Sequence, residues 1–225
     1  MVPMPAWLPV VSVTVLYLHG FASSPHSTKV AYFTERLRER GVDVRCPDFN
    51  LPDFQTLTMT RMLGQLSDAL PGENVPVTLI GSSLGGTLAI LAAARWPARI
   101  DRLILLAPAV MFAKPGHHLL PPERIDEWRR RGALAFFHYA TEAERTLDYA
   151  FYEDSLRYDA FGADIRQPTM IFQGVRDASV DCRTVEAFAR TRSNVTLSLL
   201  EDDHQLIASL PRIWNDVAPF LGLVA

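Results

Sequence analysis

The sequence predicts one α/β domain built on a mostly parallel β-sheet flanked by helices. Short runs rich in Val, Ile and Leu alternate with amphipathic helical segments along most of the 225 residues. This alternation is typical of strands joined by helical crossovers. Several of the runs, such as 102–107, are apolar at nearly every position, as expected of strands buried on both faces. A chain of this length can bury a sizeable core as a single domain, 1–225.

The predicted elements follow one another in a regular order. Strands are expected at 10–18, 42–46, 75–80, 102–107, 168–173 and 195–200, and helices at 29–40, within 53–70, and at 87–95, 183–190 and 205–220. The first helix ends at Gly41 and the second at Pro71-Gly72, because glycine and proline interrupt helical hydrogen bonding.

The segment 109–166 interrupts this rhythm and is predicted to be a helical lid or cap insertion. It has helical patterns at 123–131 and 142–152 and no convincing strand. It also holds ten of the 22 aromatic residues of the chain in 58 positions. Two interpretations remain open: the aromatic side chains cover an apolar pocket, or they anchor a small insertion on the core.

Composition and charge exclude several classes of protein. The net charge of −3 does not favour a nucleic-acid partner. The first nine residues lack a basic region and contain three prolines, unlike a signal peptide, and the apolar run 10–18 is too short to span a bilayer. Cys46 and Cys182 have no metal-ligand spacing, so a reducing, cytoplasmic setting is expected. No pattern predicts an oligomeric state.

Gly81-Ser82-Ser83-Leu84-Gly85 has the G-x-S-x-G pattern of a nucleophile elbow. The β-branched run 75–80 precedes it and the helix-forming run 87–95 follows it, which is the strand-turn-helix context that the motif requires. The pattern therefore favours Ser83 as a nucleophile over an ordinary glycine-serine turn.

A serine nucleophile needs a base and a third group that orients the base. His204 follows the strand expected at 195–200, and Asp177 follows the strand at 168–173, in the chain order Ser, Asp, His. The other five histidines precede Asp177 in the chain. Asp181, Asp202 and Asp203 remain alternatives for the acid, but Asp202 and Asp203 are too close to His204 in sequence to reach its ring nitrogen easily.

Acyl transfer also requires donors aimed at the oxyanion. One is expected from the backbone N–H of Leu84, at the start of the helix after the elbow. The second is expected from the N–H of Phe21, in the loop His19-Gly20-Phe21 that ends the first strand. His19 itself is interpreted as a structural residue that fixes this loop.

Together these motifs resemble the α/β-hydrolase superfamily. The run H-G-F-x-S-S-P-x-S-x-K at 19–29 and the run G-S-S-L-G-G at 81–86 are similar to the small YqiA-type bacterial esterases. The resemblance covers most of the chain outside 109–166. It implies hydrolysis of short or medium acyl esters through an acyl-enzyme, with no metal or organic cofactor.

The leading hypothesis is a serine carboxylesterase with the triad Ser83, His204 and Asp177 and a small-molecule acyl ester as substrate. The enzymatic alternative is a thioesterase that acts on acylated proteins or acyl carriers, which an aromatic lid over a long acyl slot would favour. A third hypothesis, from another class, is a non-catalytic hydrolase-fold protein that binds a ligand. An intact set of nucleophile, base and acid speaks against this last hypothesis.

Overall fold

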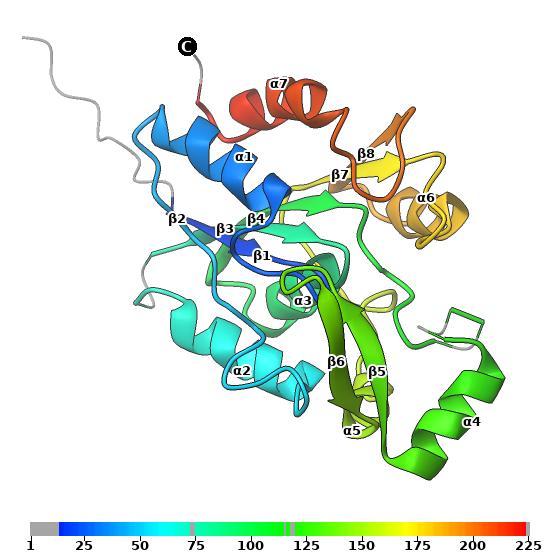
Figure 1. Ribbon diagram of the computed structural model, residues 1–225. Coiled ribbons are helices and arrows are strands. Elements are labelled where there is room, and N and C mark those ends of the chain that lie inside the picture. The colour runs from blue at the N-terminus through cyan, green and yellow to red at the C-terminus, as the bar shows by residue number, and fades with distance from the viewer. Residues whose placement is uncertain (1–13, 73–74, 115, 118–119, 224–225) are drawn as a thin grey trace, which may run out of the picture.

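The computed structural model describes residues 14–72, 75–114, 116–117 and 120–223. Residues 10–13 of the predicted first strand lie outside these ranges, as do the N-terminal residues discussed above. Strands and helices alternate through the described chain as the sequence predicts, except in the cap (Figure 1).

The core of the protein is a six-stranded sheet in which every neighbouring pair of strands is parallel. Its spatial order is β2-β1-β3-β4-β7-β8. The strands are β1 (Thr14–Leu18), β2 (Val44–Arg45), β3 (Val77–Ser82), β4 (Ile100–Leu106), β7 (Thr169–Gly174) and β8 (Val195–Leu200). The strand that carries the elbow, β3, lies at the centre of this order, and all six of its residues are buried.

Helices cover both faces of this sheet (Figure 1). Helices α1 (Thr28–Arg38) and α7 (Leu210–Phe220) pack on one face, where Phe33 and Ile213 are fully buried. Helices α2 (Met59–Ala69), α3 (Leu84–Arg95) and α6 (Cys182–Arg190) contribute to the apolar core of the other face. Helix α3 is buried on nearly all sides. This burial explains why the residues that follow the elbow are mostly small.

The insertion between β4 and β7 is not wholly helical, which corrects the prediction for 109–166. It contains α4 (Pro122–Arg131), an antiparallel hairpin of β5 (Ala133–His138) and β6 (Ala143–Asp148), and α5 (Ala150–Ser155). The predicted helix at 142–152 is wrong in its first part, because 143–148 pairs as a strand. Exposure explains the error: four of the six β6 residues are exposed, so no apolar alternation marks this strand.

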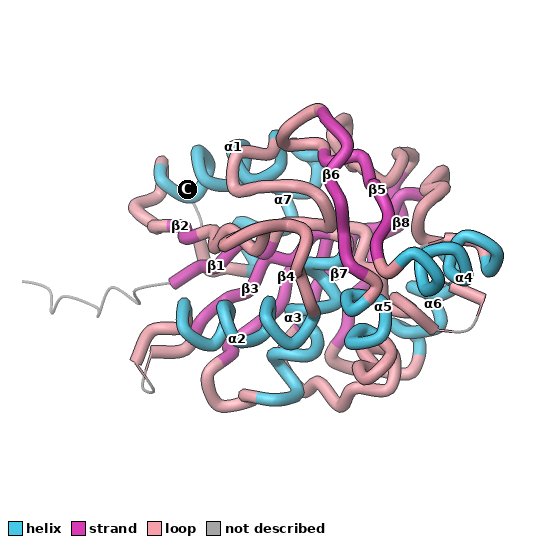
Figure 2. The backbone as a smooth tube through the Cα atoms, turned by 60° about the horizontal axis from the view of Figure 1, so that its bottom comes forward, coloured by secondary structure: helices cyan, strands magenta, loops and turns pink. Residues whose placement is uncertain are grey.

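The hairpin lies beside the loops that follow β1 and β2, at the carboxyl ends of the sheet strands (Figure 2). The backbone N–H of Tyr139 donates to the carbonyl of Ala22 at 2.9 Å, and the N–H of Asp148 donates to the carbonyl of Gln55 at 2.9 Å. The cap is thus attached to the edge of a parallel sheet where ligands usually bind.

Candidate active site

Ser83 occupies the turn between β3 and α3. Its φ of 53° lies in a region that residues other than glycine rarely adopt. Four backbone hydrogen bonds hold it there. Its N–H donates to the carbonyl of Leu106 at 2.9 Å, and its carbonyl accepts from the N–H groups of Gly86 at 2.9 Å, Thr87 at 3.3 Å and Ala109 at 3.2 Å. Such strain, imposed by the surroundings, is the feature that presents an elbow serine above the sheet.

The tight turn also explains the glycine two positions before the serine. A Cβ placed on Gly81 would lie 2.5 Å from the carbonyl oxygen of Gly85, well inside van der Waals contact. The end of β3 and the start of α3 can therefore approach this closely only because residue 81 has no side chain.

His204 lies in the loop after β8 and connects the serine to the acid. Its Nε2 lies 3.1 Å from Ser83 Oγ, and its Nδ1 lies 2.7 Å from Asp177 Oδ2. The three side chains come from loops after three different strands, β3, β7 and β8. The structure brings together the three residues that the sequence predicts, in the hydrogen-bonded order that a nucleophile, a base and an orienting acid require.

The carboxylate of Asp177 is enclosed and fully hydrogen-bonded. Its side chain is buried, Oδ1 accepts the backbone N–H groups of Ser179 and Val180 at 2.8 Å each, and Oδ2 accepts from Gln173 Nε2 at 2.9 Å. Burial alone would raise the pKa of this carboxyl, but the hydrogen bonds from His204, Val180 and Gln173 outweigh it and the pKa is lowered. The group is therefore held as an anion opposite the imidazole.

The three alternative acids have other hydrogen-bond partners. Asp181 caps the N-terminus of α6. Asp202 accepts from the backbone N–H of Ser209 at 2.9 Å, and Asp203 accepts from the backbone N–H of Gln205 at 2.8 Å. These bonds shape the loop around His204, and among the carboxylates of the described residues only that of Asp177 pairs with its ring.

Two residues near the triad have no role in the sequence-based hypothesis. Gln173, fully buried at the end of β7, binds Asp177; a polar residue inside an apolar strand is the signal that could have revealed it. Lys29, in the first turn of α1, is 8 % exposed. Its burial lowers the pKa to about 8, against the opposing charges of Asp177, Asp203 and Asp202.

The loop after β1 runs alongside the nucleophile. A Cβ on Gly20 would lie 3.4 Å from Ser83 Cβ, and the N–H of the next residue, Phe21, makes no hydrogen bond among the described residues. Leu84 is the first residue of α3, so its N–H has no partner within the helix. Both N–H groups are available as donors beside Ser83. His19 fixes the loop as expected: it accepts from the N–H of Phe49 at 3.1 Å.

The aromatic residues of the cap pack mainly on one another and on this loop. Trp128 and Phe151 are buried, and the Trp128 ring lies 4.9 Å from that of Phe136. The ring of Phe21 lies 5.5 Å from Phe151 and 5.6 Å from Phe136. For these residues the structure supports the anchoring interpretation: the aromatic core of the cap rests on the loop beside Ser83.

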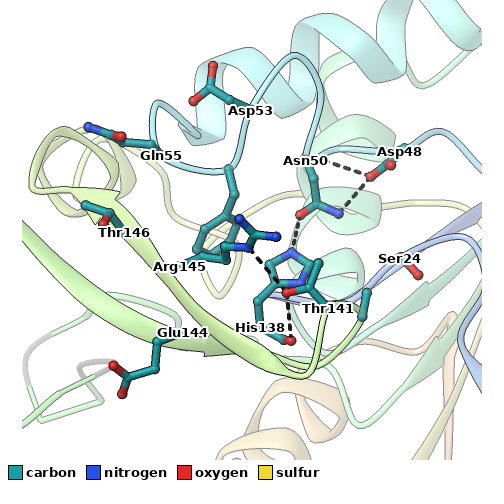
Figure 3. Close-up of a pocket in the computed structure, with 12 residues that line it drawn as sticks. Ser24, Asp48, Asn50, Asp53, Gln55, His138, Thr141, Glu144, Arg145 and Thr146 are labelled. Carbon is teal, nitrogen blue, oxygen red and sulfur yellow. Dashed lines mark hydrogen bonds between the residues drawn. The ribbon is translucent and has the colours of Figure 1, made fainter.

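A pocket of about 570 Å³, lined mainly by polar and charged residues, opens between the 48–55 loop and the tip of the hairpin (Figure 3). Asp48, Asn50, His138 and Arg145 are among its lining residues, and no member of the Ser83, His204 and Asp177 set lines it. Within the described residues there is also no group of three His, Cys, Asp or Glu side chains that could hold a metal ion. None of the helices in those ranges is long and apolar enough to cross a membrane.

The parallel sheet, the elbow serine and the loops at its carboxyl edge define an α/β-hydrolase fold. The particular family is UPF0227, described as an uncharacterised protein family: its profile matches residues 14–219, and the chain belongs to it.

Similar structures share the fold across most of the chain. The α/β hydrolase domain-containing protein 10 from mouse is 19% identical with a TM-score of 0.73, covering 94% of this chain and 90% of that one. Est1E from Butyrivibrio proteoclasticus, solved with ferulic acid bound, is 22% identical with a TM-score of 0.72, covering 94% and 89%.

A curated relative matches over a shorter region. The biotin biosynthesis bifunctional protein BioHC of Teredinibacter turnerae is 33% identical over 106 residues. The match covers 44% of this chain and 18% of the relative.

Proposed function

We propose that this protein is a serine hydrolase that cleaves carboxylic esters through an acyl-enzyme. The observation that carries the proposal is the row of hydrogen bonds from Ser83 Oγ to His204 Nε2 at 3.1 Å and from His204 Nδ1 to Asp177 at 2.7 Å. A binding protein has no need of a strained serine, a base and a buried anion in this order.

In the first half-reaction Ser83 Oγ forms a bond to the ester carbonyl carbon while His204 Nε2 takes the hydroxyl proton. The tetrahedral intermediate collapses, the bond to the alcohol oxygen breaks, and His204 returns the proton to the leaving alcohol. Asp177 keeps the proton of the imidazole on Nδ1 and stabilises the imidazolium. In the second half-reaction a water molecule attacks the acyl-enzyme by the same path and releases the acid.

The negative charge on the carbonyl oxygen is stabilised by the N–H groups of Phe21 and Leu84. The free N–H of Phe21, the position of Leu84 at the start of α3 and the closeness of Gly20 to Ser83 support this assignment. The dipole of α3 adds to the stabilisation, because its positive end points toward the developing charge.

The substrate class that we propose is an ester of a small or medium carboxylic acid. Est1E, which shares the fold, binds ferulic acid. In the cap, Trp128 and Phe151 are buried and pack on the rings of Phe136 and Phe21, which supports a short acyl group over a long one. A thioester would pass through the same acyl-enzyme, so the chemistry does not separate the two substrate classes.

Labelling with a fluorophosphonate probe, followed by peptide mapping, tests the nucleophile. We expect one label, on the peptide that contains Ser83, and none in Ser83→Ala. A label on another residue, or none on folded wild-type protein, would overturn the proposal and favour a non-catalytic ligand-binding protein.

A series of p-nitrophenyl esters tests the acyl preference. We expect the highest kcat/KM with acetate to hexanoate and a decline with longer chains. An optimum at long chains, together with faster hydrolysis of the matched acyl thioester, would instead support the thioesterase alternative.

A further inference from the structure

The loop after β1 is held in a conformation that it would not keep by itself. Ala22, next to Phe21, has a φ of 52°, which is costly for a residue with a side chain. Two contacts from outside the loop restrain its carbonyl groups: Tyr139 N–H donates to Ala22 at 2.9 Å, and Asn50 Nδ2 donates to Ser23 at 2.8 Å.

The side chain of Asn50 has three partners, Ser23, Asp48 and His138. Figure 3 shows its contacts with Asp48 and His138. Besides Ser23, its Nδ2 donates to Asp48 Oδ1 at 2.7 Å. With both donor contacts on Nδ2, Oδ1 is the acceptor that faces His138 Nε2 at 3.1 Å. The proton of His138 must therefore be on Nε2.

His138 ends β5 of the cap and precedes Tyr139, whose N–H holds Ala22. Its side chain is buried, and its ring stands at 90° to that of Phe54, with 4.8 Å between the ring centroids. Its Nδ1 has no hydrogen-bond partner among the described residues, so the bond to Asn50 is what fixes the polar orientation of the ring. The cap strand and the 48–50 segment thus form one hydrogen-bonded unit.

The same segment also holds the other end of the loop. The N–H of Phe49 donates to His19 Nε2 at 3.1 Å, which leaves His19 Nδ1 to donate to the carbonyl of Gly20 at 2.9 Å. The restraints at Gly20 and Ser23 lie on either side of Phe21. The direction of the Phe21 N–H is therefore set by the 48–50 segment and, through it, by the cap.

We propose that Asn50 and His138 are positioning residues that aim the Phe21 N–H at the oxyanion. The assignment rests on the proposed function, because it takes Phe21 as a donor to the transition state. A shift of about 1 Å in such a donor can reduce the rate by about 100-fold without changing substrate binding.

The test compares three variants of Asn50 and His138 with a matched control. Asn50→Asp keeps the size and the acceptor toward His138 but loses the donor to Ser23, and His138→Phe removes the donor to Asn50. His138→Gln is the rescue, because its Nε2 can occupy the place of the imidazole Nε2. The control is Gln55→Ala, which also breaks a hydrogen bond between the same loop and the cap, to Asp148 at 3.1 Å, but does not touch the residues around Phe21.

With p-nitrophenyl acetate, we expect Asn50→Asp and His138→Phe to lower kcat by about 10- to 100-fold with little change in KM. The rate of fluorophosphonate labelling at Ser83 should fall in parallel, since phosphonylation also places charge on an oxygen in the oxyanion site. His138→Gln and Gln55→Ala should stay within about threefold of wild type, because neither moves the donor.

Wild-type kcat in folded Asn50→Asp and His138→Phe would overturn the inference while the proposed function stands. A loss of equal size in Gln55→Ala would also overturn it, since any loosening of the cap would then suffice. If neither wild type nor Gln55→Ala labels at Ser83, the proposed function itself fails. If Asn50→Asp does not fold, the comparison of kcat between His138→Phe and His138→Gln tests the same inference.

Discussion

A Cβ on Gly85 would lie 2.0 Å from the carbonyl oxygen of Leu18. The first turn of α3 therefore rests directly on the end of β1. Because α3 begins at the nucleophile and β1 leads into the loop of Phe21, this contact sets the distance between Ser83 and one of its proposed oxyanion donors.

Gly85→Ala should destabilise the protein by about 3 kcal/mol or more, because neither backbone can yield without moving a central element. Urea unfolding followed by circular dichroism measures this. Gly64→Ala in α2 is the matched control: a Cβ there would meet no described residue outside its own turn of helix within 4 Å, and replacing glycine in a helix should stabilise by about 0.5 to 1 kcal/mol. Equal stability of the two variants would contradict the close contact.

Asp177→Asn should lower kcat by about 10⁴-fold, because an amide favours the wrong imidazole tautomer while keeping the geometry. Steady-state kinetics on an activated ester provides the measurement. Asp181→Asn in the same loop should retain full activity and stability, since asparagine caps a helix as well as aspartate does. If the two variants exchanged these properties, Asp181 would be the acid.

Phe21→Pro should lower kcat by about 100- to 1000-fold, because proline has no N–H to offer the oxyanion. Phe21→Ala keeps that N–H and removes only the ring that packs on Phe151 and Phe136. It should therefore lose stability more than catalysis. Comparing kcat with the free energy of unfolding separates the two effects, and equal kcat in both variants would remove Phe21 from the site.

Lys29→Met should stabilise the protein most near neutral pH. The folded pKa of about 8 lies below the ordinary value of 10.5, so burying the charged form costs about 3 kcal/mol below pH 8. As pH rises from 8 to 10.5 the unfolded chain holds more protons than the folded one, and wild-type stability increases relative to the variant.

Urea unfolding of both proteins at pH 7 and pH 10 measures this difference. The gain in the variant should shrink at the higher pH. A gain that does not depend on pH would mean that Lys29 keeps its charge at a normal pKa and that the effect comes from packing alone.

The cap shows where local sequence patterns stop being informative. Ala143–Asp148 contains the helix formers Ala, Glu, Arg and Leu and has mostly exposed side chains, so its own preference points to a helix. It becomes a strand because its backbone pairs with Ala133–His138, with Leu134 opposite Leu147. Pairing between segments overrides intrinsic propensity here.

The contacts around Asn50 were beyond prediction for a related reason. Asn50 and His138 are 88 positions apart, and neither belongs to a motif with a known spacing. Gln173 carried a weak signal, as a polar residue at the end of an apolar run, but a partner cannot be assigned to such a residue without the fold.

The order of residues along the chain is enough to define the parallel sheet, the elbow at Ser83 and the positions of Asp177 and His204 after their strands. These features depend on local chemistry: apolar runs form buried strands, glycines permit the tight turn, and parallel strands bring their carboxyl ends to one edge. Three-dimensional packing selects the carboxylate that reaches His204, the strand content of the cap and the restraint of the loop around Phe21. Those outcomes depend on distances between segments far apart in the chain, which only packing of the whole molecule defines.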